Sequence, residues 1–456
     1  MALGRALDRS AVTGPPAGPA PGETVEVAIE RIAYGGDGVG RADGLVVFVP
    51  WTAPGERVRA RIVERQPRYA RARLEEVVET GPARVTPGCP VYGRCGGCHL
   101  QHLDREAQLA SKARAVADAF ERIARRSLPE PLTCEEAADP WHYRRRATFT
   151  WRRSGDGLTV GFHAAEDAAA LVDVDACPIF TASGNATLAG LRRGLATAEP
   201  NGTEASAEEG RLAVRALPGN DPEAGVFAGD AGRARTLAQA CERAAGIPTT
   251  WGTRGGRWGP LELAPEAPRL VARIEIRGLK LRVGFDSFLQ ADPVAAERLY
   301  DAAVEGLAAR PGQRVVDGYA GIGALACRLS RDGVEVTAVE AHPGAASDLR
   351  ANAAATGGAD VHVLELPAER VDWGRPRPAA VVVNPPRAGC APTAIKSIAR
   401  SSARRFVYVS CDPTTLARDL RRLGPAWRLE SVRAFDLFPQ TAHVETVATL
   451  VRERER

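Results

Sequence analysis

The chain has 456 residues, of which 45% are hydrophobic and 25% charged, a composition that predicts a globular protein of two to four domains. A net charge of +4 argues neither for nor against nucleic acid, so the distribution of the arginines matters more. No bilayer-length apolar run and no secretory leader are present, so we expect a cytoplasmic protein with no membrane partner. Because the cytoplasm is reducing, the nine cysteines are expected to be free thiols for metal binding or catalysis rather than disulfides.

Residues 1–21 are rich in proline, alanine and glycine and are expected to form a disordered tail. Residues 22–80 hold short alternating segments between glycine and proline turns, which is typical of a small OB-like β-barrel. Period-two geometry places Arg57, Arg59 and Arg61 on one face of a strand. This basic stripe continues through Arg65, Arg68, Arg71 and Arg73. It favours a surface that follows nucleic-acid phosphates, with a merely solvated strand face as the alternative.

Residues 81–285 contain short β-like segments and a helix expected near 104–126. The stretches 141–146 (WHYRRR) and 151–153 (WRR) interleave aromatic residues with arginines. That combination favours stacking on bases and neutralisation of phosphates, although a purely structural β-hairpin would also explain it.

Three cysteines of this region, Cys89, Cys95 and Cys98, have C-x5-C-x2-C spacing in a segment rich in glycine and proline. Such spacing suits thiolates that converge on one centre, and Cys177 is the candidate for the fourth ligand. The spacing alone leaves zinc and a [4Fe–4S] cluster open. The remaining cysteines, apart from Cys411, are expected to be core thiols: Cys134, Cys241, Cys327 and Cys390.

From about residue 312 the pattern alternates regularly between strand and helix, which predicts a doubly wound α/β sheet. Sheets of this kind bind ligands at the carboxyl ends of their strands. The expected strands are 314–317, 335–340, 380–384 and 406–410. The expected helices lie near 324–331, 344–356, 391–400 and 413–423.

The first of these strands ends in Asp317 and leads into a glycine-rich turn, where Gly321 and Gly323 allow the backbone to approach a ligand closely. Glu340 ends the next strand, where Rossmann-type folds place a carboxylate on ribose hydroxyls. Capping of the following helix is the alternative role for Glu340. Because the third glycine of the dinucleotide motif is missing, S-adenosylmethionine is favoured over a dinucleotide.

The third strand ends in Asn384-Pro385-Pro386-Arg387, whose prolines fix an extended backbone that can present carbonyls and the Asn384 amide to a substrate. Amino-group methyltransferases often have an aromatic residue after Asn-Pro-Pro. Arg387 cannot stack on a base in the same way, but amino-group methylation is kept as an alternative.

Cys411 follows the last of these strands and precedes Asp412 and Pro413, the expected N-cap and first position of a helix. The helix N-terminus is expected to lower the pKa of the thiol. A thiolate that adds to carbon 6 of a pyrimidine makes carbon 5 nucleophilic, and a base must later remove the proton of carbon 5. Glu445 is the expected base, on the same strand face as His443, with its pKa raised by apolar neighbours. His443 is expected to be structural.

Together these motifs resemble the uracil-5 RNA methyltransferases, in particular the branch with an N-terminal TRAM domain and an iron–sulfur cluster. The likeness covers residues 22 to about 452. It includes the cysteine motifs with Gln101-His102, Phe288-Leu289-Gln290, the glycine turn, Asn384-Pro385-Pro386-Arg387, Val409-Ser410-Cys411-Asp412-Pro413 and Phe438-Pro439-Gln440-Thr441-x-His443-Val444-Glu445. The last two are highly specific in combination.

The resemblance implies a TRAM domain at 22–80, a β-rich central domain at 81–285 that carries the cysteine cluster, and a Rossmann-like class I methyltransferase domain at 286–456. It implies that Cys411 is the nucleophile and Glu445 the base. It also implies that Gln290, Tyr319, Glu340 and Asn384 line the S-adenosylmethionine and uracil site. The metal assignment moves to [4Fe–4S] over zinc. The implied substrate is 23S ribosomal RNA, with transfer RNA second, and no obligate protein partner is evident.

Three positions depart from the family pattern: Asn384 stands where Asp is usual, Asp292 where Asn is usual, and Ala324 where a polar residue is usual. The first departure removes a negative charge near a cationic sulfonium, which predicts weaker cofactor binding or slower turnover. An RNA-binding factor with an impaired site is therefore a further alternative.

Overall fold

The computed structural model describes residues 18–154, 157–199, 208–255, 260–375 and 377–453, which form two compact units. The first unit comprises the described residues up to Thr86 and His99–Ala107, and the second comprises Pro87–Cys98 and Gln108 onward. Most of the tail expected at 1–21 lies outside the described residues. The domain boundaries at 80 and 285 stay predictions.

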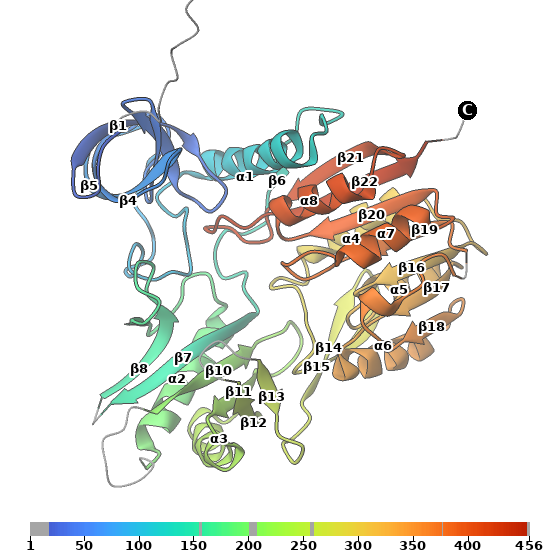
Figure 1. The fold of residues 1–456 in the computed structure, drawn as a ribbon. Helices are drawn as coiled ribbons and strands as arrows, with labels where there is room; N and C mark the ends of the chain where they lie inside the picture. Colours follow the sequence, from blue (N-terminus) through green and yellow to red (C-terminus); the bar gives the residue numbers. More distant parts are fainter. Residues whose placement is uncertain (1–17, 155–156, 200–207, 256–259, 376, 454–456) are drawn as a thin grey trace, which may run out of the picture. The chain divides into compact units, whose positions relative to one another are not determined.

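The first unit contains a closed five-stranded barrel in the order β1-β2-β3-β5-β4 (Figure 1). Val27, Val47 and Val58 point into it and are fully buried, so the barrel predicted from the alternating segments is confirmed. Its strands are β1 (Thr24–Ile32), β2 (Gly38–Ala42), β3 (Leu45–Val49), β4 (Arg57–Arg65) and β5 (Tyr69–Glu79).

Arg57, Arg59 and Arg61 of β4 are exposed and alternate with buried residues, as period two predicts. They are not a bare basic stripe, because the antiparallel neighbour β5 supplies a glutamate to each. The ion pairs are Arg57–Glu79, Arg59–Glu76 and Arg61–Glu75. Exposed pairs of this kind contribute little to stability, so phosphates could displace the glutamates at small cost.

In the second unit, a seven-stranded sheet has the order β13-β12-β11-β10-β7-β8-β9, and two helices share a hydrophobic core with it (Figure 1). The helices are α2 (Ala182–Thr197) and α3 (Ala231–Ala245). The strands are β7 (Arg146–Ser154), β8 (Gly157–His163), β9 (Leu171–Asp173), β10 (Glu208–Arg215), β11 (Glu223–Ala228), β12 (Thr249–Arg254) and β13 (Leu261–Leu263).

The aromatic residues expected to stack on bases lie mostly in the interior. Trp151 is fully buried in the core between the seven-stranded sheet and its helices. Tyr143 is buried and donates its hydroxyl hydrogen bond to the Pro439 carbonyl at 3.0 Å. A buried ring has no free face for a base, so the expectation was wrong for these two residues.

The methyltransferase-like sheet has eight strands in the order β18-β17-β16-β19-β20-β22-β21-β6 (Figure 1). Strands β18 to β20 are parallel and β22 is antiparallel to β20. The predicted α/β fold is confirmed. The elements predicted from sequence are β16 (Arg314–Gly318), α5 (Ala324–Arg331), β17 (Glu335–Val339), α6 (Pro343–Thr356), β19 (Ala380–Val383), α7 (Pro392–Arg400), β20 (Arg405–Ser410) and α8 (Pro413–Leu423).

Several elements of the second unit were not anticipated. The main ones are β6 (Cys134–Glu135), α4 (Ala296–Leu307), β18 (Val361–Leu364), the 3-10 turn η2 (Ala368–Arg370) and β21 (Trp427–Phe435). A two-stranded hairpin also precedes α4, formed by β14 (Val271–Ile276) and β15 (Leu279–Gly284). The strand expected around His443 and Glu445 is β22 (Glu445–Arg452). Among the described residues, no helix is long and apolar enough to cross a membrane.

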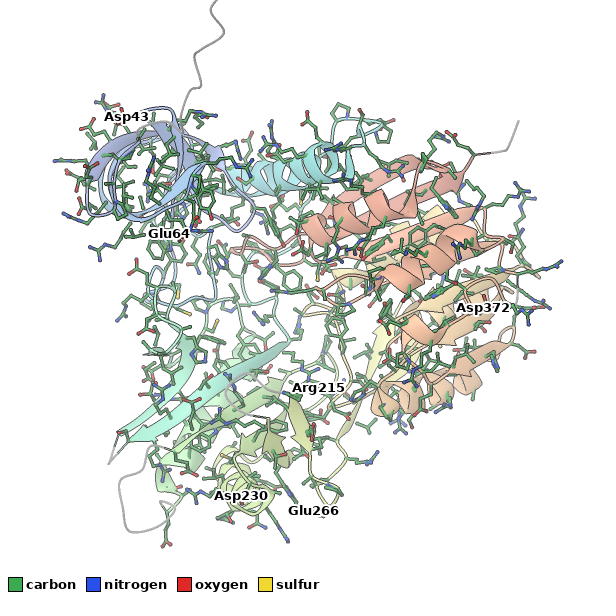
Figure 2. All side chains as sticks on the ribbon, viewed as in Figure 1. Asp43, Glu64, Arg215, Asp230, Glu266 and Asp372 are labelled. Carbon is green, nitrogen blue, oxygen red and sulfur yellow. The ribbon has the colours of Figure 1, made fainter. Side chains whose placement is uncertain are left out.

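Arg215, at the end of β10, links the seven-stranded sheet to the β14-β15 hairpin (Figure 2). Its side chain is 2% exposed and donates to the Glu223 carboxylate and, at 2.6 Å, to the Gly284 carbonyl. Asp348 holds the same turn, since it accepts from the Gly284 amide at 2.6 Å and from the Ser287 hydroxyl at 2.7 Å. These contacts fix the chain that leads to Gln290.

Helix α1 (Arg105–Ala119), followed by the π-helical turn η1 (Phe120–Ala124), accounts for the helix expected near 104–126. Its buried Lys112 forms an ion pair with buried Asp436 and donates to the Phe438 carbonyl at 2.9 Å. Gln108 and Gln440 exchange two hydrogen bonds of 3.1 Å. Helix α1 therefore supports the segment that leads to Glu445.

The buried position of Trp151 can be tested by Trp151→Ala. Loss of the packed indole is expected to lower the free energy of unfolding by about 3–5 kcal/mol, measured by urea denaturation followed by circular dichroism. Trp141→Ala, at a half-buried site, is the control and should cost less. Unchanged stability with weakened RNA binding in Trp151→Ala would show instead that the ring is a base platform.

Candidate active site

A cavity of about 1010 Å³ opens where the parallel strands of the eight-stranded sheet end. Seven of the nine catalytic and cofactor residues predicted from sequence line it: Gln290, Tyr319, Gly321, Glu340, Asn384, Cys411 and Glu445. The other two, Asp317 and Gly323, do not. The carboxyl ends of parallel strands meet at one edge of a sheet, which explains why residues distant in sequence converge here.

Asp317 and Gly323 lie behind the cavity wall. Asp317 is 1% exposed, and burial, together with the charge of Glu340, raises its pKa to about 7. Gly323 precedes α5 with φ of +88°, and a Cβ there would lie 2.9 Å from Leu349. These two residues therefore shape the glycine turn.

Glu340 connects the two turns on the cofactor side of the cavity. Its carboxylate accepts from the Gly321 amide at 2.8 Å and from the His342 amide at 2.7 Å. The N-cap of α6 is His342, so Glu340 is not the capping residue. Gly321 has φ of +58° and open space where a Cβ would stand. A carboxylate beside a glycine that leaves the cavity free fits the ribose end of S-adenosylmethionine.

Cys411 and Glu445 are brought together by strand register. Strands β20 and β22 are antiparallel, and their last pair is Ser410 with Thr446, so Cys411 and Glu445 occupy the next opposed positions. Glu445 is the first residue of β22, and His443 precedes the strand, contrary to the expectation that both lie on one strand. Both residues nevertheless line the cavity.

The two groups hold their protons more tightly than usual. Burial, with repulsion from the Glu445 carboxylate, raises the pKa of Cys411 to about 11, although the Arg387 guanidinium offsets part of the rise. Burial likewise raises the pKa of Glu445 to about 7, against the opposing effect of Arg387. The expectation of a lowered pKa for the thiol was wrong, because desolvation and the Glu445 carboxylate raise it and Arg387 offsets only part of the rise.

The helix after Cys411 starts as predicted. Asp412 is the N-cap of α8, and its carboxylate accepts from the amides of Thr414 at 2.8 Å and Thr415 at 3.0 Å. Pro413 occupies the first turn. These contacts fix the backbone that carries the Cys411 thiol.

Sequence reasoning did not foresee the position of Arg387. Its side chain is exposed at the cavity, and its Nη2 lies 3.0 Å from His443 Nε2. Arg144 and Arg146, singled out within 141–146, also reach the cavity wall. Two features of the sequence could have indicated these positions: Arg387 directly follows Pro385-Pro386, and Arg144 and Arg146 stand at alternate positions of one segment.

The four cysteines of the predicted cluster are half-buried. Burial raises the pKa of both Cys95 and Cys177, and Cys89 adds to the rise in each. The Gly97 amide donates to the Cys95 sulfur at 3.4 Å. Within the described residues, no three potential ligands are arranged to hold a metal ion. The cysteines predicted to be core thiols, Cys134, Cys241, Cys327 and Cys390, are all buried, which confirms that expectation.

Comparisons with known proteins identify two segments of the chain. Residues 20–74 match the TRAM domain family, and residues 269–453 match the tRNA (uracil-5-)-methyltransferase family. An uncharacterized RNA methyltransferase of Halalkalibacterium halodurans is 31% identical, over 94% of this chain and 97% of the relative. A second, of Thermosynechococcus vestitus, is 32% identical over 94% and 98%.

Among solved structures, the tRNA (uracil-54, C5)-methyltransferase of Pyrococcus abyssi, in complex with S-adenosyl-L-homocysteine, superposes with a TM-score of 0.72. The two chains are 23% identical, and the match covers 94% of this chain and 100% of the other. At this identity the likeness is one of fold.

The opposed charges around Cys411 predict opposite effects of two substitutions. Glu445 is ionised above about pH 7, so it repels the thiolate throughout the alkaline range. Glu445→Gln is therefore expected to lower the pH midpoint of Cys411 alkylation by iodoacetamide, and Arg387→Gln to raise it. Peptide-resolved mass spectrometry separates Cys411 from the other cysteines. Equal midpoints in both variants would mean that these charges do not face the thiol.

Proposed function

The chain belongs to the RNA uracil-5 methyltransferase family, and we propose that it methylates carbon 5 of a uridine in structured RNA through a covalent adduct of Cys411. The opposition of Cys411 and buried Glu445 within one cavity carries this proposal. A nucleophile and a base on neighbouring strands can act on adjacent carbons of one ring.

In the proposed reaction the Cys411 thiolate adds to carbon 6 of the uracil, and the electron pair of the 5,6 double bond moves toward carbon 5 and the carbonyl at carbon 4. The thiol needs activation, because its pKa is raised to about 11 by burial. Arg387 favours the thiolate by its charge. A flipped uridine is required, since a stacked base cannot present carbon 6 to the sulfur.

The proposed base is Glu445. Once carbon 5 carries the methyl group, Glu445 takes its proton, the double bond re-forms and the bond between carbon 6 and sulfur breaks. A pKa raised to about 7 by burial suits a group that must first be ionised and then hold a proton.

S-Adenosylmethionine, when bound, supplies the methyl group. We propose that Glu340 and Gly321 hold its ribose end and that Gln290, Tyr319 and Asn384 complete the cofactor and uracil site, since all five line the cavity. Asp317 and Gly323 would act by shaping the turn. Asn384 can donate and accept hydrogen bonds but adds no charge, whereas Glu340 supplies a carboxylate to the cavity.

We propose 23S ribosomal RNA as the substrate, gripped by the TRAM barrel, in a cytoplasmic enzyme. The exposed arginines of β4 and β5 support an RNA-binding role for the barrel, because phosphates can replace the glutamate partners of Arg57, Arg59 and Arg61. The Pyrococcus abyssi enzyme with the same fold acts on tRNA, so transfer RNA is the competing substrate.

The covalent mechanism is tested with RNA that contains 5-fluorouridine. Fluorine cannot leave as a proton, so a stable adduct between Cys411 and the RNA is expected to accumulate with S-adenosylmethionine present. Parallel reactions with 23S ribosomal RNA and transfer RNA, mapped by mass spectrometry, identify the target. With native uridine, turnover should fall as the pH drops below about 7, because Glu445 becomes protonated.

Cys411→Ala separates the alternatives. Retained turnover in this variant would favour amino-group methylation at Asn384-Pro385-Pro386. RNA binding by the native chain without any methyl incorporation would identify an RNA-binding factor. Cys241→Ala, which removes a buried thiol from the core of the seven-stranded sheet and its helices, is the matched control.

We further propose that Cys89, Cys95, Cys98 and Cys177 hold a [4Fe–4S] cluster. The C-x5-C-x2-C spacing of the first three cysteines and the resemblance to the iron–sulfur branch of the family support this proposal. Cys89 and Cys95 act electrostatically on Cys177, which associates this fourth thiol with the other cysteines. A bound cluster would join residues 89–98 to the segment around Cys177 by iron–sulfur bonds.

Anaerobically purified protein is expected to contain about four irons per chain, measured by inductively coupled plasma mass spectrometry. Cys177→Ser should lose most of this iron, whereas Cys241→Ala, at a buried cysteine outside the group, should keep it. One zinc per chain and no iron would overturn the cluster proposal.

A further inference from the structure

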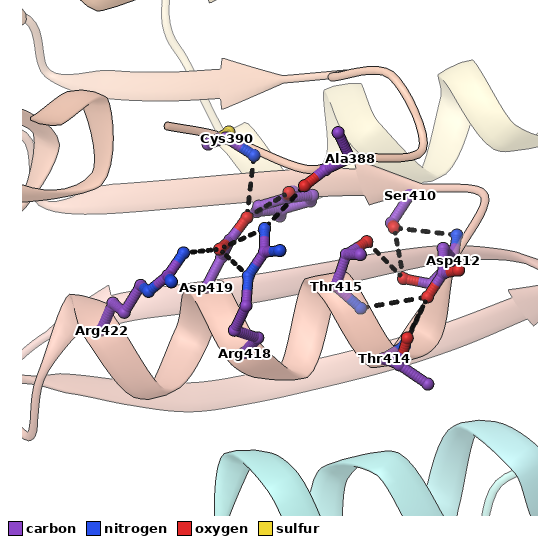
Figure 3. A network of polar contacts seen from close by, with 10 residues as sticks. Ala388, Cys390, Ser410, Asp412, Thr414, Thr415, Arg418, Asp419 and Arg422 are labelled. Carbon is purple, nitrogen blue, oxygen red and sulfur yellow. Dashed lines mark hydrogen bonds and ion pairs between the residues drawn. The ribbon is translucent and has the colours of Figure 1, made fainter. Parts of the chain in front are cut away.

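The loop at residues 384–390, which carries Arg387 into the cavity, ends on a buried carboxylate of helix α8. Asp419 is fully buried, and its Oδ2 accepts hydrogen bonds from the Cys390 amide at 2.8 Å and from the Tyr408 hydroxyl at 3.0 Å (Figure 3). One oxygen thus joins the loop, strand β20 and helix α8.

The second oxygen strengthens the same junction. Asp419 Oδ1 accepts from Arg418 Nε at 2.9 Å and from Arg422 Nη1 at 3.1 Å (Figure 3). Arg418 then reaches the loop itself, because its Nη2 donates to the Ala388 carbonyl at 2.7 Å. Among the described residues, Arg422 bonds to Asp419 but not to the loop. Only Arg418 therefore joins Asp419 to the 384–390 loop.

The loop is built to approach this carboxylate. Gly389 has φ of +77°, and a Cβ at that position would stand 2.5 Å from Asp419 Oδ2. Any other residue would be strained in this conformation and would push the loop away from the helix. Burial of a carboxylate is costly unless its hydrogen bonds are satisfied, and here donors from three elements satisfy it.

We propose that Asp419 is a positioning residue that fixes the 384–390 loop on α8 and thereby holds Arg387 beside Cys411 and Glu445. This inference deepens the proposed function and rests on it for the nucleophilic role of Cys411. Asp419 touches no reacting atom in the proposal. It acts through the backbone of Ala388 and Cys390, one and three residues after Arg387.

The charges around the thiol make the role measurable. The groups that act on Cys411 are Glu445 from β22, Arg387 from the loop and the adjacent Asp412. Those around Asp419 are Cys390, Tyr408 and its two arginines, with Tyr319 on the cavity side. Direct loss of a negative charge at 419 would favour the thiolate, whereas loss of Arg387 from its place would disfavour it. The two explanations predict opposite signs.

The test is the pH dependence of Cys411 alkylation in the full chain without RNA or cofactor. Asp419→Asn is expected to raise the midpoint by about one pH unit, in the direction of Arg387→Gln. The double variant should shift no further than Arg387→Gln alone, because both changes remove the same charge from the thiol. An unchanged or lowered midpoint in folded Asp419→Asn, or additive shifts, would overturn the proposal.

Two further variants keep the test decisive where Asp419→Asn does not fold. Arg418→Gln, which loses the contact to Ala388, is expected to raise the midpoint. Its matched control, Arg422→Gln, loses an equal charge but no loop contact and should leave the midpoint unchanged. Equal effects of the two arginines would refute a role through the loop.

Turnover then connects the role to catalysis. Asp419→Asn is expected to lower kcat by up to about 100-fold, with an unchanged KM for S-adenosylmethionine. Alkylation requires no RNA, so its outcome stands apart from that of the 5-fluorouridine experiment. A shifted alkylation midpoint in Asp419→Asn, with no RNA adduct in the native chain, would refute the proposed function and support the positioning role of Asp419. An RNA adduct with an unshifted midpoint would support the proposed function and refute the positioning role.

Discussion

The site depends on one piece of strand pairing. Strand β22 runs antiparallel to β20, so Glu445, the first residue of β22, lies opposite Cys411, the residue that follows β20. This register sets buried Glu445 against half-buried Cys411. Desolvation disfavours the thiolate and the carboxylate, so the pKa values of both Cys411 and Glu445 are raised. The nearby positive charge of Arg387 favours ionisation of both groups.

Much of the sheet could be predicted because its signals are local. Apolar strands followed by glycine or Asp-Pro turns placed β16 and α8 within about a residue, and Asp412 caps its helix as its position indicated. β6 could not be foreseen, because two residues have no period and pair with β21 only in the folded sheet. Trp151 was misread because an aromatic residue among arginines has the same pattern in a core strand as on an RNA-binding surface.

The site residues followed the same division. Cys411, Glu445 and Glu340 were identified from motif positions, since the ends of parallel strands converge in every sheet of this type. The acidity of Cys411 was not, because it depends on burial and on Glu445, which only the fold brings near. The Pro-Pro turn before Arg387 did not reveal its role either, since its contact with His443 joins segments that are distant in the chain.

The ion pair between Lys112 and Asp436 bears on what counts as a separable piece of this protein. The segment matched by the methyltransferase family starts at residue 269, yet Asp436 is buried inside it against a lysine from the helix that precedes the seven-stranded sheet. Cut out alone, that segment would keep the interior Asp436 carboxylate without its Lys112 partner and would expose the edge of β21 that β6 covers. The segment that the family shares is therefore not a unit that is expected to be stable on its own.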